Sequence, residues 1–207
     1  MNPVRTAVSN WLYDKGPGRY YRPAYGHIAR AIGLSEGAFL DVGCGPGWLS
    51  IQVAAGRPDL DAVGIDRSPG MIALADRHRG GHLNITFREM EASHILYAEG
   101  TFSAAAAVQS AHHWQDTPAI LAEVHRVLQP AGCFYVYEAD RDQTEVPQDW
   151  IERRRGWPPD RVVRLGWQRF GMDAEEWGAL RAEAEASPFS TVVDDRHGFY
   201  RRLVLTR

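Results

Sequence analysis

The sequence predicts an α/β fold in which helices cover both faces of a mostly parallel β-sheet. The first observation behind this prediction is that short apolar segments alternate with helical patterns along residues 20–140. The second is that the last part of the chain breaks the alternation, because residues 189–193 and 200–205 have strand character and enclose the turn-like sequence DDRHG. We therefore expect the sheet to end in an antiparallel hairpin.

Each predicted element has its own local signal. Short apolar segments before polar or glycine-rich turns predict strands at residues 39–42, 62–66, 83–88, 102–109 and 133–138. Ser68 as N-cap, Pro69 at the first helical position and Gly80 after the last turn delimit one helix. The remaining helices are predicted at residues 20–33, 48–55, 116–129 and 173–186. Within residues 116–129, apolar residues recur at spacings of three and four, and Pro130 and Gly132 are expected to stop the helix.

Length predicts the domain organisation. The chain has 207 residues, and at about 150 residues per domain it is expected to form a single domain over residues 1–207. Residues 1–33 are predicted to form an N-terminal helical cap. Residues 141–172 have weak periodicity, and a connection of this length is more often functional than accidental. We expect this segment to form a lid-like insertion over a substrate site.

Composition limits the class of protein. No segment approaches the roughly 20 apolar residues of a membrane span, and the first residues lack the apolar core of a signal peptide. Cys44 and Cys133 are too few for a disulfide scaffold, so a cytoplasmic location is expected. The chain has 23 basic and 26 acidic residues, a net charge of -3 that argues against a general nucleic-acid binder. The oligomeric state is not predicted.

A glycine-rich turn follows the first predicted strand, with the sequence DVGCGPG over residues 41–47. Glycines allow a tight turn and a close approach of the backbone to a ligand. The spacing G-x-G-x-G departs from the dinucleotide pattern G-x-G-x-x-G. Asp41 beside this turn would repel a pyrophosphate and would suit a cationic ligand such as a sulfonium or an amino group. The alternative is that Asp41 only caps its own turn.

Two more acidic residues follow the next two predicted strands. Asp66 ends the second strand, where a carboxylate can accept hydrogen bonds from ribose hydroxyls, or can instead cap the helix at Ser68. Glu91 follows the third strand and could meet an adenine amino group, or could be a solvated loop charge. Met71 or Met90 would then lie against the ring, although ordinary core packing is the competing interpretation.

Five ordered stretches carry a family resemblance. FLDVGCGPGWLS, VGIDRSPGMIALA, ITFREMEA, AHHWQD and LAEVHRVLQPAGCFYVYE resemble class I S-adenosylmethionine-dependent methyltransferases, in particular the small-molecule group that includes quinone-biosynthesis enzymes. The match spans about residues 20–140 and the terminal hairpin. The resemblance implies a Rossmann-like seven-stranded sheet whose last-but-one position is taken by an antiparallel strand. It also implies S-adenosylmethionine as cofactor, with S-adenosylhomocysteine as its product.

The resemblance assigns roles to individual residues. The methionine part of the cofactor would be held by the glycine turn and by Gln109, and Asp66 would bind both ribose hydroxyls. The adenine would lie between Arg67 and Met71, with Glu91 at a position where Asp is more usual. Tyr21 or Arg22 would reach the ligand carboxylate, or would only pack the N-terminal helix. The cofactor-binding residues implied are Tyr21, Arg22, Asp41, Gly43, Cys44, Gly45, Asp66, Arg67, Met71, Met90, Glu91 and Gln109.

The segment after the fourth predicted strand supplies the candidate catalytic residues. His112 and His113 follow the strand that faces the methyl group in this family, and histidine titrates near neutral pH as a general base should. The alternative is that they hold a loop together through hydrogen bonds. A metal site formed by these histidines and Asp116 is a weaker interpretation, so no metal is predicted.

Motifs that the sequence lacks narrow the class of compound that accepts the methyl group. The segment 110–114 lacks the Pro-Pro-aromatic motif of the family's amino-directed nucleic-acid enzymes, and neither cysteine is placed as a nucleophile for pyrimidine carbon. We therefore expect methyl transfer to an oxygen, nitrogen or carbon atom of a small molecule. Trp150, Trp157, Trp167 and Phe170 could line its pocket or only pack the lid. The alternatives are a non-catalytic S-adenosylmethionine-binding protein, a macromolecule methyltransferase or an NAD-dependent oxidoreductase.

Overall fold

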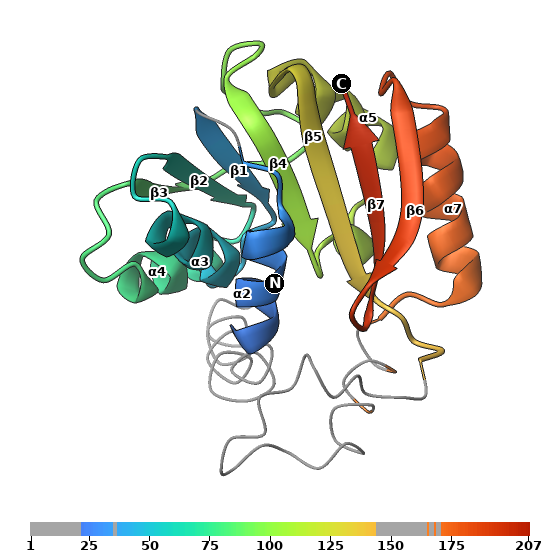
Figure 1. The fold of residues 1–207 in the computed structure, drawn as a ribbon, viewed down its shortest axis with the longest axis horizontal. Helices are drawn as coiled ribbons and strands as arrows, with labels where there is room; N and C mark the ends of the chain where they lie inside the picture. Colours follow the sequence, from blue (N-terminus) through green and yellow to red (C-terminus); the bar gives the residue numbers. More distant parts are fainter. Residues whose placement is uncertain (1–21, 35–36, 144–164, 166–167, 169–170) are drawn as a thin grey trace.

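The computed structural model of this chain describes residues 22–34, 37–143, 165, 168 and 171–207. Within this part, seven strands form one sheet in the order β3-β2-β1-β4-β5-β7-β6 (Figure 1). The strands are β1 (Ala38–Val42), β2 (Asp61–Asp66), β3 (Ile85–Glu89), β4 (Phe102–Val108), β5 (Leu128–Ala139), β6 (Thr191–His197) and β7 (Tyr200–Thr206). The first five are parallel to one another, and β7 is antiparallel to both β5 and β6. The predicted fold class is confirmed, including the antiparallel strand in the last-but-one position.

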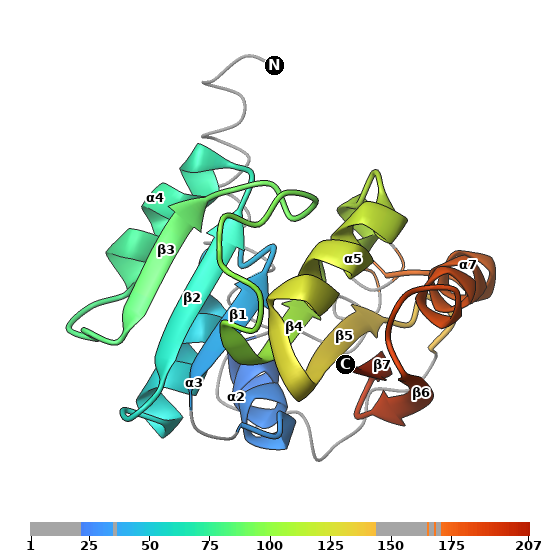
Figure 2. The same ribbon diagram turned by 90° about the horizontal axis from the view of Figure 1, so that it is seen from above.

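Helices cover both faces of the sheet, as Figures 1 and 2 show. One face packs against α2 (Arg22–Ala31), α3 (Trp48–Gly56) and α4 (Pro69–His78), and the other packs against α5 (Thr117–Val127) and α7 (Ala174–Glu185). Successive side chains of a strand point to opposite faces. Phe39 therefore joins the first core and Leu40 the second, and each is fully buried.

The cap signals read from the sequence form as expected. The Ser68 side chain accepts a hydrogen bond from the Met71 amide at 3.4 Å at the start of α4. Asp116 does the same for the Ala119 amide at 3.1 Å at the start of α5. Such caps satisfy amides that have no partner inside the helix.

The predicted DDRHG turn is wrong. Asp194, Asp195 and Arg196 belong to β6, and the reversal occurs only at residues 198–199, where Gly198 has φ 63°. The charged residues sustain the strand because cross-strand partners neutralise them, as in the 2.7 Å hydrogen bond from Arg202 Nε to the Asp195 carboxylate. A polar run that is typical of a turn thus forms an edge strand.

Two strand boundaries also differ from the prediction. The third strand begins at Ile85, because Leu83 is 97% exposed and lies outside the sheet. The fifth strand begins at Leu128 and already contains Pro130 and Gly132, although α5 does end before them at Val127. The pairing of β4 with β5 shifts register in this region, and such an irregularity accommodates a proline inside a strand.

Two predictions stand outside what the structure tests. The N-terminal cap is described only from Arg22 onward, and most of the lid-like insertion, including its four aromatic residues, lies outside the described residues. The division into a single domain with a cap and a lid stays a prediction. No helix that the structure describes has both the length and the apolar character needed to span a bilayer.

Candidate active site

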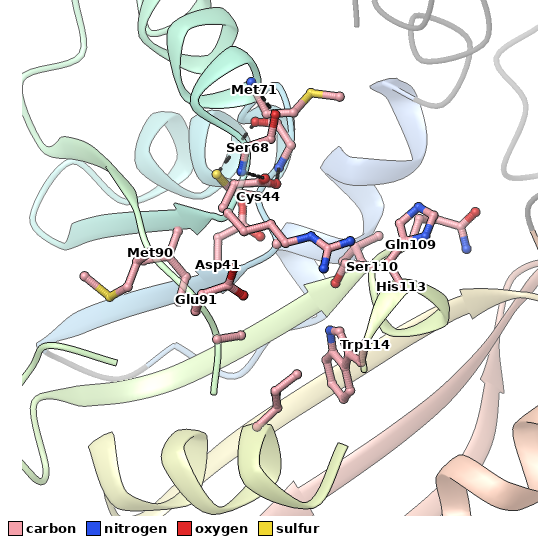
Figure 3. A pocket seen from close by; sticks show the side chains of 18 of the residues that line it. Asp41, Cys44, Ser68, Met71, Met90, Glu91, Gln109, Ser110, His113 and Trp114 are labelled. Atoms are coloured by element: carbon pink, nitrogen blue, oxygen red, sulfur yellow. Dashed lines mark hydrogen bonds between the residues drawn. The ribbon is translucent and has the colours of Figure 1, made fainter. Parts of the chain in front are cut away.

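A cavity of about 650 Å³ opens at the carboxyl ends of the parallel strands. It lies where the strand order reverses, since the chain proceeds from β1 to β2 on one side and returns to β4 on the other. Ligands of open α/β sheets bind at such a switch point. Figure 3 shows side chains from several strand ends around this cavity, with Met90 and Glu91 across from Gln109 and His113.

The cavity brings together the predicted site residues that the structure describes. Tyr21 lies outside the described residues, and Arg22 begins α2 without a described side chain. One continuous wall is lined by residues of the glycine turn, of the ends of β2, β3 and β4, and of the segment 109–113 after β4. We call residues 109–113 the histidine segment. The predicted residues in it are Asp41, Gly43, Cys44, Gly45, Asp66, Arg67, Met71, Met90, Glu91, Gln109, His112 and His113.

The glycine turn is fixed against the end of β2. The Gly43 and Cys44 amides both donate to the Ile65 carbonyl at 2.9 Å, and the Gly45 amide donates to Asp66 Oδ2 at 2.9 Å. Gly43 has φ 70°, in the left-handed region that favours glycine. A Cβ at this position would lie 2.7 Å from the Ser110 Cβ, so the turn also fits closely against the segment after β4.

Asp41 is a buried carboxylate at the end of β1 and is only 2% exposed. Its Oδ2 accepts hydrogen bonds from the Ser50 amide at 3.1 Å and the Ser50 hydroxyl at 2.7 Å, so it caps the first turn of α3 from a distance. Burial raises the pKa of Asp41 to about 7, against the opposing effect of the Ser50 hydrogen bonds and with a further increase from the charge of Asp66. The capping role and a place in the cavity wall therefore coexist.

Asp66 links the glycine turn to α4. Its Oδ1 accepts from the Ser68 amide at 2.8 Å while its Oδ2 accepts from the Gly45 amide. Burial raises the pKa of Asp66, although these two amide hydrogen bonds oppose the rise. Each carboxylate oxygen has two lone pairs, so Asp66 can accept further hydrogen bonds from a ligand in the cavity.

The wall beyond Asp66 is less enclosed. Met71 and Met90 are half-buried, while Arg67 and Glu91 are exposed at the rim. The Met90 sulfur accepts a hydrogen bond from the Leu96 amide at 3.4 Å, which fixes the side chain against the loop after β3. The two methionines thus present apolar surface suited to a flat ring, with a carboxylate close by.

The histidine segment turns sharply after β4 and forms hydrogen bonds with Glu138, the penultimate residue of β5. Gln109 has φ 54°, and the segment continues as the single turn η2 (Ala111–His113). Glu138 Oε2 lies 2.9 Å from His112 Nδ1 and 3.0 Å from Gln109 Nε2. Its Oε1 accepts from the Ala111 amide at 2.7 Å. His112 therefore does hold the loop through a hydrogen bond, and it lines the cavity as well.

The two histidines have opposite electrostatic environments although their ring centroids are 4.0 Å apart. Burial would lower the pKa of His112, but the hydrogen bond to Glu138 and its charge outweigh burial and raise it. Burial and then the neighbouring charges of His112 and Arg67 lower the pKa of His113. The pair thus separates into a more basic and a less basic imidazole.

Sequence reasoning missed several residues at the site. Tyr25 on α2 lines the cavity, and Ser110 both lines it and donates to the Val42 carbonyl at 2.9 Å. Glu138 lies beneath the cavity wall. The signal for Glu138 was present in the sequence, because an acidic residue at the carboxyl end of a predicted strand is the same feature that identified Asp41 and Asp66.

Comparisons with known proteins agree with this geometry. A family model described as a methyltransferase domain matches residues 39–132. Demethylmenaquinone methyltransferase of Chlorobaculum parvum is 34% identical over 131 residues, which are 62% of this chain and 53% of that protein. The family model covers less than half of this chain, so these matches show that the chain is similar to methyltransferases. The predicted family resemblance is confirmed.

Solved methyltransferase structures share the fold at low sequence identity. A putative S-adenosyl-L-methionine-dependent methyltransferase of Methanococcus maripaludis superimposes with a TM-score of 0.72 at 17% identity, covering 97% of this chain and 90% of that chain. The plantazolicin methyltransferase in complex with SAH gives 0.67 at 12% identity, covering 100% and 91%. This chain spans about half the length of the curated relative described above.

Proposed function

We propose that this chain transfers a methyl group from S-adenosylmethionine to an oxygen, nitrogen or carbon atom of a small molecule. The observation that carries the proposal is the pair of carboxylates at neighbouring strand ends in one cavity, Asp41, which is buried, and Asp66, which is partly buried. When bound, S-adenosylmethionine supplies an electrophilic methyl group on a positively charged sulfur. Relatives named for menaquinone and ubiquinone synthesis support a small-molecule acceptor.

The residues present fit this cofactor by their chemistry. Burial and the charge of Asp66 raise the pKa of Asp41 to about 7 because they disfavour its charged form, and the ammonium group of a methionine moiety would stabilise that form. We assign Asp41, Gly43, Cys44, Gly45 and Gln109 to this moiety. A phosphate-bearing dinucleotide would instead meet two carboxylates, which argues against the oxidoreductase alternative.

The other assignments follow the cavity wall. Asp66 would accept hydrogen bonds from the ribose hydroxyls with the lone pairs that its two amide partners leave. Met71, Met90 and Arg67 would enclose the adenine, and Glu91 would accept from its amino group. Tyr21 and Arg22 complete the proposed set at the ligand carboxylate.

The acceptor side of the cavity has different chemistry. His112 and His113 are the proposed proton acceptors, and Trp114 stacks on Phe134 with ring centroids 6.2 Å apart, giving an apolar wall beside them. Holding donor and acceptor in a productive orientation supplies much of the rate in such a displacement, with effective molarities of about 10⁵ M or more. A cavity of about 650 Å³ is within the range of small-molecule sites, roughly 300–1,000 Å³.

Calorimetric titration with S-adenosylhomocysteine, with NAD as the control ligand, tests the proposal. We expect binding of the first and none of the second, followed by methyl incorporation in a screen of small acceptors with labelled donor. Binding of NAD alone would support the oxidoreductase alternative. Binding of S-adenosylhomocysteine with incorporation only into protein or nucleic acid would support a macromolecular acceptor. A cytoplasmic location stays a prediction that cell fractionation would test.

A further inference from the structure

Glu138 is a fully buried carboxylate beneath the histidine segment, and the proposed cofactor site does not use it. Removing a carboxylate from water costs several kcal/mol unless good hydrogen bonds replace the lost solvation. Three N–H donors and one imidazole nitrogen surround it. Oε1 accepts from the Ala111 amide at 2.7 Å and the His112 amide at 3.4 Å, while Oε2 lies 3.0 Å from Gln109 Nε2 and 2.9 Å from His112 Nδ1.

These contacts determine where the proton of His112 lies. An ionised carboxylate can only accept hydrogen bonds, so the contact with Glu138 Oε2 requires a proton on His112 Nδ1. A neutral imidazole then has its lone pair on Nε2. His112 is part of the cavity wall and its side chain is 18% exposed, so this ring is reachable from the side on which an acceptor would lie.

We propose that Glu138 is a positioning residue that holds His112 as the general base of methyl transfer, with Nε2 taking the proton of an acceptor hydroxyl group. This inference rests on the proposed function. It assigns one role to each histidine, with His112 as the base and His113 as a neighbouring wall residue. It also narrows the acceptor to a compound whose nucleophilic oxygen carries a proton.

The step balances in atoms and charge. The acceptor oxygen forms a bond to the methyl carbon and gives its proton to His112 Nε2, while the electron pair of the broken carbon–sulfur bond stays on sulfur. One positive charge is lost at the sulfonium and one is gained at the imidazolium. The imidazolium lies beside the Glu138 carboxylate, which stabilises it until the proton passes to solvent.

The electrostatic surroundings of His112 support this assignment. Burial lowers the pKa of His112, but Glu138 on β5 outweighs burial and raises it, and Glu176 on α7 adds to the rise while Arg141 opposes it. The pKa of His113 is lowered by burial, by His112 and by Arg67. Divergent shifts in adjacent titratable groups separate a proton acceptor from a group that stays neutral.

Nitrogen-15 NMR of the histidine side chains in the full chain tests the inference, with His112 assigned from the signal lost in His112→Gln. We expect neutral His112 in the wild type to carry its proton on Nδ1. Glu138→Gln should lower the His112 pKa and weaken that tautomer preference, and Glu138→Asp should restore part of both. His113→Ala, the matched control, should keep the Nδ1–H tautomer of His112.

Activity gives a second readout once an acceptor has been found with labelled donor. His112→Ala should lower turnover about 100-fold or more, the scale of general base catalysis. Glu138→Gln should shift the acidic limb of the pH–rate profile to lower pH, because a general base acts in its deprotonated form. A wild-type His112 with its proton on Nε2 overturns the inference, and this holds even if the Glu138 variants fail to fold. Unchanged His112 titration in folded Glu138→Gln also overturns it. Failure of the wild type to bind S-adenosylhomocysteine overturns the proposed function instead.

Discussion

The two halves of the cavity differ in how their polar groups are held. At the ends of β1 and β2, Asp41 accepts a hydrogen bond from the Ser50 amide, and Asp66 accepts from the amides of the glycine turn and of Ser68. At the ends of β4 and β5, the histidine segment depends on Glu138, which lies 26 positions from His112 in the chain. The carboxylates of the first half, the acidic half, mainly bind backbone amides, whereas in the second half a carboxylate binds the imidazole side chain of His112. By its chemistry, the first half suits a cationic cofactor and the second half suits proton transfer.

The largest expected effect comes from a change at the boundary between the halves. Gly43→Ala places a Cβ on a residue with φ 70° and 2.7 Å from the Ser110 Cβ. The combined backbone strain and overpacking should lower the free energy of unfolding by about 2–5 kcal/mol. Chemical denaturation measures this. Gly56→Ala is the matched control, because a Cβ there meets nothing within 4 Å, and equal stabilities of the two variants would contradict the close fit between the halves.

The next effect isolates the acidic half. Asp66→Asn replaces a carboxylate that accepts from the Gly45 and Ser68 amides by an amide with a single acceptor oxygen. Loss of charged hydrogen bonds to the ribose should weaken S-adenosylhomocysteine binding by about 1.5–3 kcal/mol, roughly 10- to 150-fold. Calorimetry measures the change. Asp59→Asn, at an exposed carboxylate paired with Arg57, is the control, and an unchanged affinity in Asp66→Asn would remove the ribose assignment.

The affinity for S-adenosylhomocysteine should also depend on pH through Asp41, in the acidic half of the cavity. Because the pKa of Asp41 is raised to about 7, a cationic ligand group favours its deprotonated form and binding releases a proton. Affinity for S-adenosylhomocysteine should therefore rise with pH through about 7 in the wild type and rise less in Asp41→Asn. Both proteins keep the same histidines, so the difference between their pH profiles reports Asp41 alone. Identical profiles would exclude a contact between Asp41 and the ligand cation.

The same group affects stability with the opposite trend. The folded pKa of Asp41 lies above the ordinary value of 3.8, so between about pH 4 and pH 7 the folded state holds more protons than the unfolded state. The contribution of Asp41 to stability is full below this window and is lost as pH rises through it. The free energy of unfolding of Asp41→Asn minus that of the wild type should accordingly be larger at pH 8 than at pH 5. Urea denaturation at the two pH values measures this difference. A constant difference would contradict the raised pKa.

The smallest expected effect is that of the histidines on cofactor affinity. His112→Ala and His113→Ala remove groups from the second half of the cavity and leave the carboxylates of the first half in place. Each should change S-adenosylhomocysteine affinity by no more than about threefold, within the range of substitutions away from a binding contact. Calorimetry of the folded variants measures this. A loss comparable to that of Asp66→Asn would show that the two halves do not act separately.

The sequence alone determined the fold class and most of the acidic half, because the signals for both are local. The alternation of apolar strands and capped helices predicts the parallel sheet, and the carboxyl ends of parallel strands necessarily meet at one edge. Asp41, Asp66 and the glycine turn could therefore be placed together without coordinates. The turn predicted at residues 194–198 is wrong because only the local sequence could be used. This charged sequence is typical of a loop, and its cross-strand partners, such as Arg202, are known only from the structure.

Only the tertiary structure decided the chemistry of the second half. His112 and His113 are adjacent residues of the same type. His112 is hydrogen-bonded to Glu138, whereas the charges of His112 and Arg67 lower the pKa of His113. Side-chain pKa values and tautomers depend on which charges and donors lie within a few ångströms, and those distances are set by strand pairing between β4 and β5 and by the left-handed turn at Gln109. The proposal of His112 rather than His113 as the base therefore depends on packing, because it requires a contact with Glu138 that no local pattern specifies.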